Sequence, residues 1–389
     1  MFEYRPSRIF KDPAKLSFDY VPDTLVHREK ELKRLYAMFQ QVVSHGLAQR
    51  ALITGSVGTG KTVLSKRFCM DFKGYGGSKG KVLDFVHVNC RQRSTENAVL
   101  LRILSHYDPR FPDRGFSTQE MLQILRARLE KEGIHLIVVL DEVDVLLKKS
   151  GADLVYALSR FDEERLSPKG NLSLIMISQK GVLDLLDPAA LSTFKRSNVI
   201  DLGRYTQGEL VDILAARVEL ALQPGTISSD AVEMIADIAS EWGDARYAIE
   251  ILEKSGTLAD ESGMGEIGPE HVRAAKAETY SVVSTGKLQP LPTHERCVLL
   301  AAARLLRKEA YVTTGEVESA YAVVCEEYGE KSRGHTQFWS YLKNLSANGL
   351  IDTKPSGKGT AGKTTLISIL DIPAGELAEQ LERMLRAAP

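Results

Sequence analysis

Two eight-residue stretches of this chain fit the pattern G-x-x-x-x-G-K-[ST], whose backbone N–H groups and lysine bind phosphate. They are GSVGTGKT at 55–62 and GKGTAGKT at 357–364. A phosphate loop needs a buried strand before it and a helix directly after it. The first match has both, with RALIT before it and VLSKRFCMDF after it. We therefore expect the first match to bind nucleotide through Val57, Gly58, Thr59, Gly60, Lys61, Thr62 and Val63.

The second match lacks this context. DTKPS precedes it, with a proline, and the β-branched run TLISIL follows it. Residues 357–364 therefore fit the tip of a β-hairpin, not a phosphate loop. The hairpin tip is either a solvated loop or a basic arm that reaches toward a polyanion.

A second element of an ATPase site is an apolar strand that ends in acids, and LIVVLDEVD at 136–144 supplies it. We expect this strand beside the phosphate-loop strand, with Asp141 and the Thr62 hydroxyl holding Mg²⁺. Glu142 would orient and deprotonate the attacking water. The next apolar strand, LSLIMIS, ends at Ser178 and Gln179. Gln179 either reaches the γ-phosphate or the water, or is only a polar strand end.

The apolar runs indicate where these residues are held. Runs of β-branched residues alternate with helical stretches up to residue 202, which is typical of a parallel sheet buried on both faces. The pattern then changes to helices alone. The sequence predicts a nucleotide-binding base at 1–204 with an extended lead-in at 1–25, a helical domain at 205–285, a linker at 286–292 and a further domain at 293–389.

Arg246 stands in the first turn of a helix that WGDAR introduces in the helical domain. An arginine is disfavoured there by the helix dipole, which favours a bound anion near it. A solvated arginine is the alternative.

Composition narrows the class of protein. The 389 residues carry a net charge of −1, so nucleic-acid binding would need a local basic patch. The four cysteines form no C-x-x-C pair, which argues against a zinc site and for a reducing cytoplasm. The N-terminus lacks the apolar core of a signal peptide, and no apolar run is long enough to cross a membrane.

Such a patch lies near the C-terminus. Thr313 and Glu316 form a capping box that opens one helix, and HTQFWSYLKNLSANG predicts a second. Between 331 and 363 there are six cations and one acid, Asp352. Side chains suited to phosphates and base edges are Arg333, Thr336, Gln337, Ser340, Lys343, Lys354, Lys358 and Lys363. The domain would bind double-stranded DNA or, alternatively, dock on a protein.

Together these motifs resemble the archaeal replication initiators related to the origin recognition complex and cell division control protein 6. The resemblance rests on IFKDPAKLSFDYVPDTLVHREKEL, GTGKT, LDEVD, LLDPAAL, YTQGELVDIL, GDAR and TTGEVESAY. It implies an α/β fold: an AAA+ P-loop parallel-sheet base, an all-α lid and a C-terminal winged helix. It also implies that Val26, His27 and Arg28 lie beside the adenine, that Tyr205 and Arg217 line the nucleotide from the opposite side, and that Arg246 senses phosphate from the lid.

The chain departs from the family pattern at two positions. Gln179 stands where the family usually has Asn, and Thr193 follows Ser192 where relatives often have an arginine that contacts a neighbouring subunit's nucleotide. Lys195 or Arg196 could substitute. We therefore expect tight ATP or ADP binding, slow hydrolysis and a switch rather than a motor. The family also carries a helical insertion, where Arg110 and Arg114 are weak DNA-contact candidates.

The resemblance implies a cytoplasmic, nucleoid-associated initiator that binds replication-origin DNA under ATP/ADP control. It would help load the replicative helicase, and paralogous initiators could be partners. Three alternatives remain. The chain could be a clamp-loader-like ATPase whose winged helix docks on protein, a transcription regulator, or an accessory or inhibitory paralogue.

Overall fold

The computed structural model describes residues 7–163, 170–179, 182, 198–279, 288–355, 365–370 and 372–386. The chain divides into two compact units. One is Val21–Tyr205, and the other joins the N-terminal segment up to Tyr20 to Thr206–Pro389. Within the described residues, no helix has the length and apolar character needed to cross a membrane.

The Val21–Tyr205 unit, which we call the base, is built on one parallel sheet with the order β2-β3-β4-β1-β5. The expected parallel sheet of apolar runs is confirmed, and its strands are β1 Arg50–Gly55, β2 Leu83–Asn89, β3 His135–Asp141, β4 Asn171–Ser178 and β5 Val199–Leu202. Every residue of β3 and β4 is buried, because helices cover both faces of the sheet. One expectation is wrong: β4 lies between the phosphate-loop strand β1 and the acidic strand β3. Strand order depends on crossovers that apolar runs do not encode.

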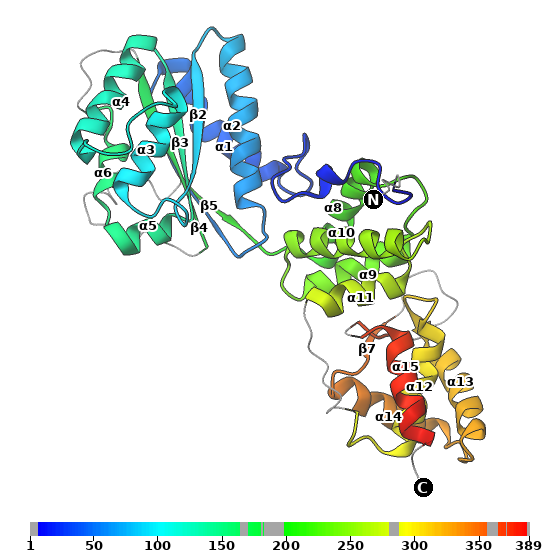
Figure 1. Cartoon of the computed structure of the whole chain (residues 1–389). Helices are drawn as coiled ribbons and strands as arrows, with labels where there is room; N and C mark the ends of the chain where they lie inside the picture. The colour runs from blue at the N-terminus through cyan, green and yellow to red at the C-terminus, as the bar shows by residue number, and fades with distance from the viewer. Residues whose placement is uncertain are drawn as a thin grey trace, which may run out of the picture. The chain divides into compact units, whose positions relative to one another are not determined.

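Figure 1 shows helices on both sides of the base sheet. On one side, Phe39, Phe68 and Phe72 form the aromatic centre of the core. The helices of this side are α1 Glu29–His45 and α2 Lys61–Ser78. The other face is covered by α3 Glu96–Tyr107, α4 Thr118–Glu132, α5 Val143–Ser150 and α6 Asp153–Ser159. This two-sided packing is the predicted α/β base.

The second unit begins with four lid helices, α8 Gln207–Ala221, α9 Ser229–Ser240, α10 Ala245–Glu261 and α11 Pro269–Thr279. Residues 7–20 pack on this lid, with the 3₁₀ turn η1 at Pro13–Leu16. The backbone N–H of Lys11 donates to the Ala221 carbonyl at 2.8 Å, and Ile9 and Leu16 are fully buried. The sequence predicts this lead-in as part of the base, whereas it belongs to the unit that holds the lid. Its few apolar residues have no period that could indicate their partner.

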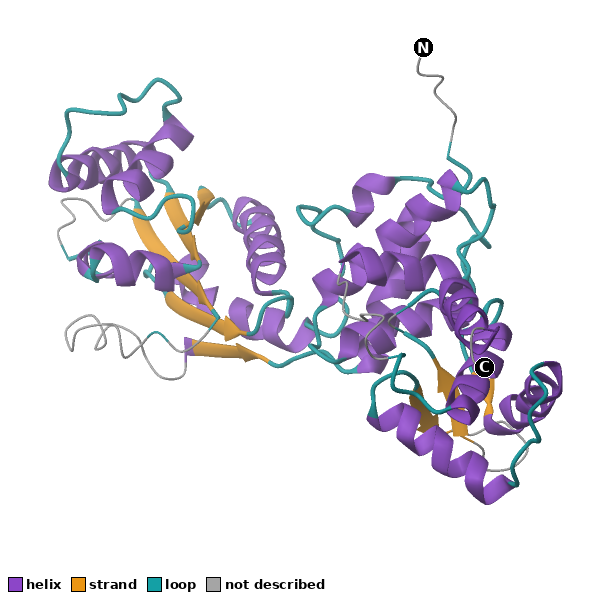
Figure 2. Cartoon of the chain, turned by 60° about the horizontal axis from the view of Figure 1, so that its bottom comes forward, coloured by secondary structure: helices purple, strands orange, loops and turns teal. Residues whose placement is uncertain are grey.

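The winged helix follows, and Figure 2 shows that this unit's strands lie there and not among the lid helices. Its helices are α12 Thr293–Leu306, α13 Thr314–Glu327, α14 His335–Ala347 and α15 Ala374–Arg386. The antiparallel sheet has the order β6-β8-β7, with β6 Val312–Thr313, β7 Asp352–Pro355 and β8 Thr365–Ser368. The second G-x-x-x-x-G-K-[ST] match falls between β7 and β8, as expected for a hairpin, although its residues lie outside the described ones.

Candidate nucleotide site and winged-helix surface

The first phosphate-loop match has the backbone that its chemistry needs. The loop leaves β1 at Gly55, and α2 begins at Lys61. Gly58 and Gly60 adopt φ values of +72° and +88°, which favour glycine. The ammonium of Lys61 donates to the carbonyls of Gly55 at 2.7 Å and Ser56 at 2.5 Å. Lys61 is thus held over the loop by carbonyls, in reach of a bound phosphate.

Thr62, at the start of α2, meets Asp141, at the end of β3, although the phosphate-loop strand β1 is not a neighbour of β3. The Thr62 hydroxyl donates to Oδ2 of Asp141 at 2.6 Å, and Asp141 is only 5% exposed. Burial alone would raise the pKa of Asp141. The nearby His87 ring, 3.4 Å away, and the Thr62 hydroxyl outweigh burial and lower that pKa. Two hard oxygen donors at one point suit Mg²⁺. The sequence alone does not indicate His87, because no local pattern shows that β2 pairs with β3.

Glu142 sits in a strained backbone position next to Asp141. Its φ is +54°, which is unusual for a residue with a side chain and is found mostly at functional sites. Nε of Arg91 donates to Oε2 of Glu142 at 2.6 Å. Arg91 lies on the loop after β2, and no motif in the sequence indicates it. On β4, Ser178 donates to Asp144 at 3.2 Å, and Gln179 is exposed at the strand's end.

The residues expected beside the adenine gather against the phosphate loop, and Tyr205, which was expected on the opposite side of the nucleotide, lies with them in the base. His27 has a φ of +62°, and Arg28 is only 6% exposed. The Arg28 guanidinium donates to the carbonyls of Thr59 at 3.1 Å and Gly203 at 2.8 Å, and lies 3.9 Å from the Tyr205 ring centroid. A Cβ on Gly60 would come within 3.0 Å of the Tyr205 hydroxyl. Half-buried Val26 precedes this cluster.

The two lid arginines lie in the other unit. Arg217 is buried, and its guanidinium donates to the Lys15 carbonyl at 2.8 Å. Burial lowers the pKa of Arg217. Arg246 is exposed in the first turn of α10, where Asp244 caps the helix as expected. The Arg246 guanidinium lies 5.6 Å from the Phe18 ring centroid.

In the winged helix, α14 has the predicted division of faces. Phe338, Leu342 and Leu345 are buried, and the expected DNA-contact side chains are exposed: Arg333, Thr336, Gln337, Ser340 and Lys343. The predicted capping box of Thr313 and Glu316 opens α13.

The remaining cations differ in their surroundings. Nε of Arg333 donates to Nε2 of His294 at 3.0 Å. Lys354 is engaged within the unit, since its ammonium lies 2.8 Å from Oδ2 of Asp237 on the lid. Lys358 and Lys363 lie outside the described residues.

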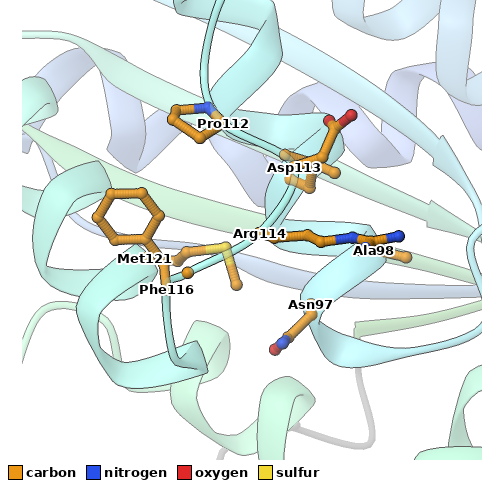
Figure 3. A pocket seen from close by; sticks show the side chains of 9 residues that line it. Asn97, Ala98, Pro112, Asp113, Arg114, Phe116 and Met121 are labelled. Carbon is orange, nitrogen blue, oxygen red and sulfur yellow. The ribbon is translucent and has the colours of Figure 1, made fainter.

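Arg110 and Arg114 are exposed on the loop between α3 and α4. Arg114 lines a hollow of about 380 Å³ together with Asn97, Phe116 and Met121. In Figure 3 the Arg114 side chain extends across this hollow, and its tip is drawn beside Ala98 of α3. Asp113 also lines the hollow, so the positive charge of Arg114 lies beside a carboxylate on this insertion.

Models of known families match this chain in three consecutive parts. An AAA domain model matches residues 26–186, a Cdc6 AAA+ ATPase-type lid model matches 211–277, and a CDC6 C-terminal winged-helix model matches 286–378. ORC1-type DNA replication protein 2 of Sulfurisphaera tokodaii is 34% identical over 388 residues, which cover 96% of this chain and 92% of the relative. The chain belongs to the ORC1-type DNA replication proteins.

Solved structures support this assignment. Cdc6p from Pyrobaculum aerophilum matches with a TM-score of 0.82 and 31% identity, covering 97% of this chain and 99% of that one. The Aeropyrum pernix ORC1 protein, solved in complex with DNA, gives 0.65 and 30%, covering 97% and 98%. The Aeropyrum pernix ORC2 protein, solved as ADPNP–ADP complexes, gives 0.65 and 26%, covering 97% and 99%. This ORC1-type protein thus has the AAA+ base, lid and winged helix that its sequence predicts.

Proposed function

We propose that this ORC1-type protein is a replication initiator that binds double-stranded origin DNA through its winged helix and is switched by ATP and ADP. The observation that carries the nucleotide half is the convergence of Lys61, Thr62, Asp141 and Glu142 at one edge of the base sheet. The DNA half rests on the exposed polar face of α14. The ADPNP–ADP and DNA complexes of relatives support both halves.

The residues of the base fit a Mg²⁺–nucleotide complex. Thr62 and Asp141 would hold the metal, since their oxygens are 2.6 Å apart and hard donors suit Mg²⁺. When bound, the metal would neutralise phosphate charge. Lys61 would bind the β- and γ-phosphates, and Val26, His27, Arg28 and Tyr205 would enclose the adenine. Arg217 and Arg246 would close over the nucleotide from the lid.

Hydrolysis by this site should be slow. Glu142 can take a proton from water only when its carboxylate is free, and Arg91 now holds it at 2.6 Å. Gln179 would orient the water with a longer and less rigid side chain than the asparagine usual in the family. A slow ATPase suits a switch, because each nucleotide state lasts long enough to set the state of the DNA.

On the DNA side, α14 would enter the major groove and the β7–β8 hairpin would contact the backbone. Thr336, Gln337, Ser340 and Lys343 would face the duplex, and Arg110 and Arg114 would add contacts from the base. Loading of the replicative helicase, cooperation with paralogous initiators and a nucleoid location complete the proposal.

The test compares DNA binding by the full chain and by Lys343→Ala at two salt concentrations, on genomic fragments from the source genome. We expect selective binding that weakens with salt, and a salt slope shallower by about one in the variant. Lys308→Ala, an exposed lysine elsewhere in the winged helix, is the matched control and should keep the wild-type slope. Equal slopes in all three proteins would favour the alternative in which the winged helix docks on protein.

A further inference from the structure

The largest fully buried side chain of the described residues is an arginine on the lid. Arg273 of α11 is 0% exposed, and its guanidinium points into the winged helix. There it donates to four backbone carbonyls: Ile369 at 2.7 Å, Leu306 at 2.6 Å, Glu309 at 3.1 Å and Ala310 at 3.4 Å. These carbonyls come from the end of α12, the turn after it and the residue after β8. One lid side chain thus joins three segments of the winged helix.

A charge in such a position needs a partner, because an unpaired buried charge is strongly disfavoured. Glu270, one turn earlier on α11, supplies it through Oε1, 2.8 Å from Nη1 of Arg273. Burial lowers the pKa of Arg273, and Glu270 opposes this shift. Glu270 also accepts from the backbone N–H groups of Ala374 at 3.0 Å and Gly375 at 2.9 Å. It therefore caps the start of α15 from the lid.

A second contact joins the same two domains. Asp237 on lid helix α9 accepts a hydrogen bond from the Tyr311 hydroxyl and pairs with the ammonium of Lys354 at 2.8 Å. That ammonium also lies 3.6 Å from the Tyr311 ring centroid. Lys354 lies on β7, the strand that leads into the basic hairpin. The root of the wing is therefore fixed to the lid.

We propose that Arg273, together with Glu270, is the positioning residue that fixes the winged helix on the lid, so that the two move as one body. Rotation of the winged helix against α11 would separate the guanidinium from carbonyls held in three segments. Such a loss is all-or-none, because packed interfaces switch between discrete arrangements rather than deform. Lid motion would then carry α14 with it, a consequence that rests on the proposed function.

The interface also changes the interpretation of Lys354. The sequence predicts it as a DNA contact, yet its ammonium is engaged by Asp237 and Tyr311. If Lys354 serves the interface, Lys354→Ala and Asp237→Ala should both loosen the winged helix on the lid. If Lys354 instead contacts DNA, the two changes should have opposite effects on DNA affinity: Lys354→Ala removes a cation and weakens binding, and Asp237→Ala removes an acid and strengthens it.

The test measures the distance between spin labels at Thr257→Cys on α10 and Ser319→Cys on α13, both exposed positions. The four native cysteines are buried, so labelling can be directed to the new ones. We expect one narrow distance distribution, and a width at least about twofold larger in Arg273→Ala. Arg273→Lys should also broaden it, because one ammonium cannot bond four separated carbonyls. Arg304→Ala, which breaks surface ion pairs inside the winged helix, is the matched control and should leave it narrow.

Two results would overturn the proposal: a broad distribution in the unmodified pair, or an unchanged width in Arg273→Ala. If Arg273→Ala does not fold, Glu270→Ala replaces it, since the arginine keeps its carbonyls but loses its counter-charge and α15 loses its cap. An unchanged width there would overturn the proposal equally. The readout needs neither DNA nor nucleotide. A failure of the proposed function would appear instead as absent DNA binding with the narrow distribution intact.

Discussion

At the residue scale, we predict opposite effects on nucleotide binding for substitution of the lysine in each of the two phosphate-loop matches. Lys61→Ala should abolish ATP and ADP binding, because Lys61 lies at the start of α2 and is held over the loop by the Gly55 and Ser56 carbonyls. Lys363→Ala should leave nucleotide affinity unchanged, weaken DNA binding and reduce the salt slope by about one. Titration of both variants with a fluorescent nucleotide and with DNA checks both expectations. Loss of nucleotide binding in Lys363→Ala would mean that the two loops have been confused.

Arg91 gives a prediction about rate. Its bond to Glu142 occupies the carboxylate that would activate water. Arg91→Ala should therefore raise the steady-state ATPase rate several-fold, up to about tenfold, and leave nucleotide affinity unchanged. Arg93→Ala, an exposed arginine two residues away, is the matched control and should keep the wild-type rate. A slower Arg91→Ala enzyme would show that Arg91 assists hydrolysis rather than restraining Glu142.

His294 gives a prediction about orientation at the DNA surface. It accepts from Nε of Arg333 at 3.0 Å and stacks on Tyr341, with ring centroids 5.8 Å apart. His294→Phe keeps a ring for stacking but loses the acceptor, so the guanidinium is no longer fixed. We expect His294→Phe and Arg333→Ala each to weaken DNA binding about tenfold, equivalent to ~1.4 kcal/mol.

A double-mutant cycle measures this coupling. The double variant should bind DNA no more weakly than Arg333→Ala alone, and His294→Gln, which retains an acceptor oxygen, should recover part of the affinity. Additive losses would show that His294 acts independently of Arg333.

Sequence patterns could indicate residues that belong to a motif. They could not indicate residues whose proposed roles depend on contacts between segments far apart in the chain. Lys61, Thr62 and Asp141 were predicted because strand, loop and helix must place them together. His87, Arg91 and Arg273 gave no such signal. The partner of His87 lies on another strand, the partner of Arg91 is the positive-φ residue Glu142, and the partners of Arg273 lie in another domain. Only folding brings these partners near.

At the element scale, the capping box of α13 allows a prediction about pH. The Thr313 hydroxyl and N–H group donate to Glu316 and lower the pKa of its carboxyl. A lowered pKa stabilises the fold fully above the ordinary glutamate range, and this stabilisation is lost as pH falls through the lowered pKa. The difference in unfolding free energy between wild type and Glu316→Gln should thus be largest near pH 7 and shrink toward pH 3.

Denaturation followed by Trp339 fluorescence in a Trp242→Phe background measures this difference within the winged helix. In a Thr313→Ala background the pH dependence of the Glu316→Gln effect should diminish, because one of its two donors is gone. An effect that stays constant with pH would mean that the carboxylate charge does not contribute to the cap.

The elements themselves were largely predictable. All five strands of the base, the two caps and the β7–β8 hairpin follow from local patterns of apolar, turn and capping residues. The order of the strands could not be predicted, because β4 lies between β1 and β3 through a crossover that local patterns do not encode. Neither could the packing of residues 7–20 on the lid, since Ile9, Phe10 and Leu16 lack helical or strand periodicity.

At the scale of the whole molecule, charge and architecture place proposed nucleotide binding and proposed DNA binding in different domains. The chain as a whole has a net charge of −1, while its C-terminal domain concentrates cations around α14 and the wing. Most of the residues proposed to bind nucleotide lie in the base, two lie on the lid, and the lid shares a buried interface with the winged helix through Arg273. A nucleotide that biases the lid would therefore bias the presentation of α14 to DNA.

We expect nucleotide binding and DNA binding to be coupled, and because such coupling is reciprocal it can be measured from either side. The most direct measurement is the affinity of the full chain for a genomic origin fragment with ATP, with ADP and without nucleotide, at one fixed salt concentration. The account predicts different affinities in the ATP and ADP states, by about fivefold or more, and no such difference in Lys61→Ala. Equal affinities in all three conditions, with nucleotide binding verified separately, would contradict it.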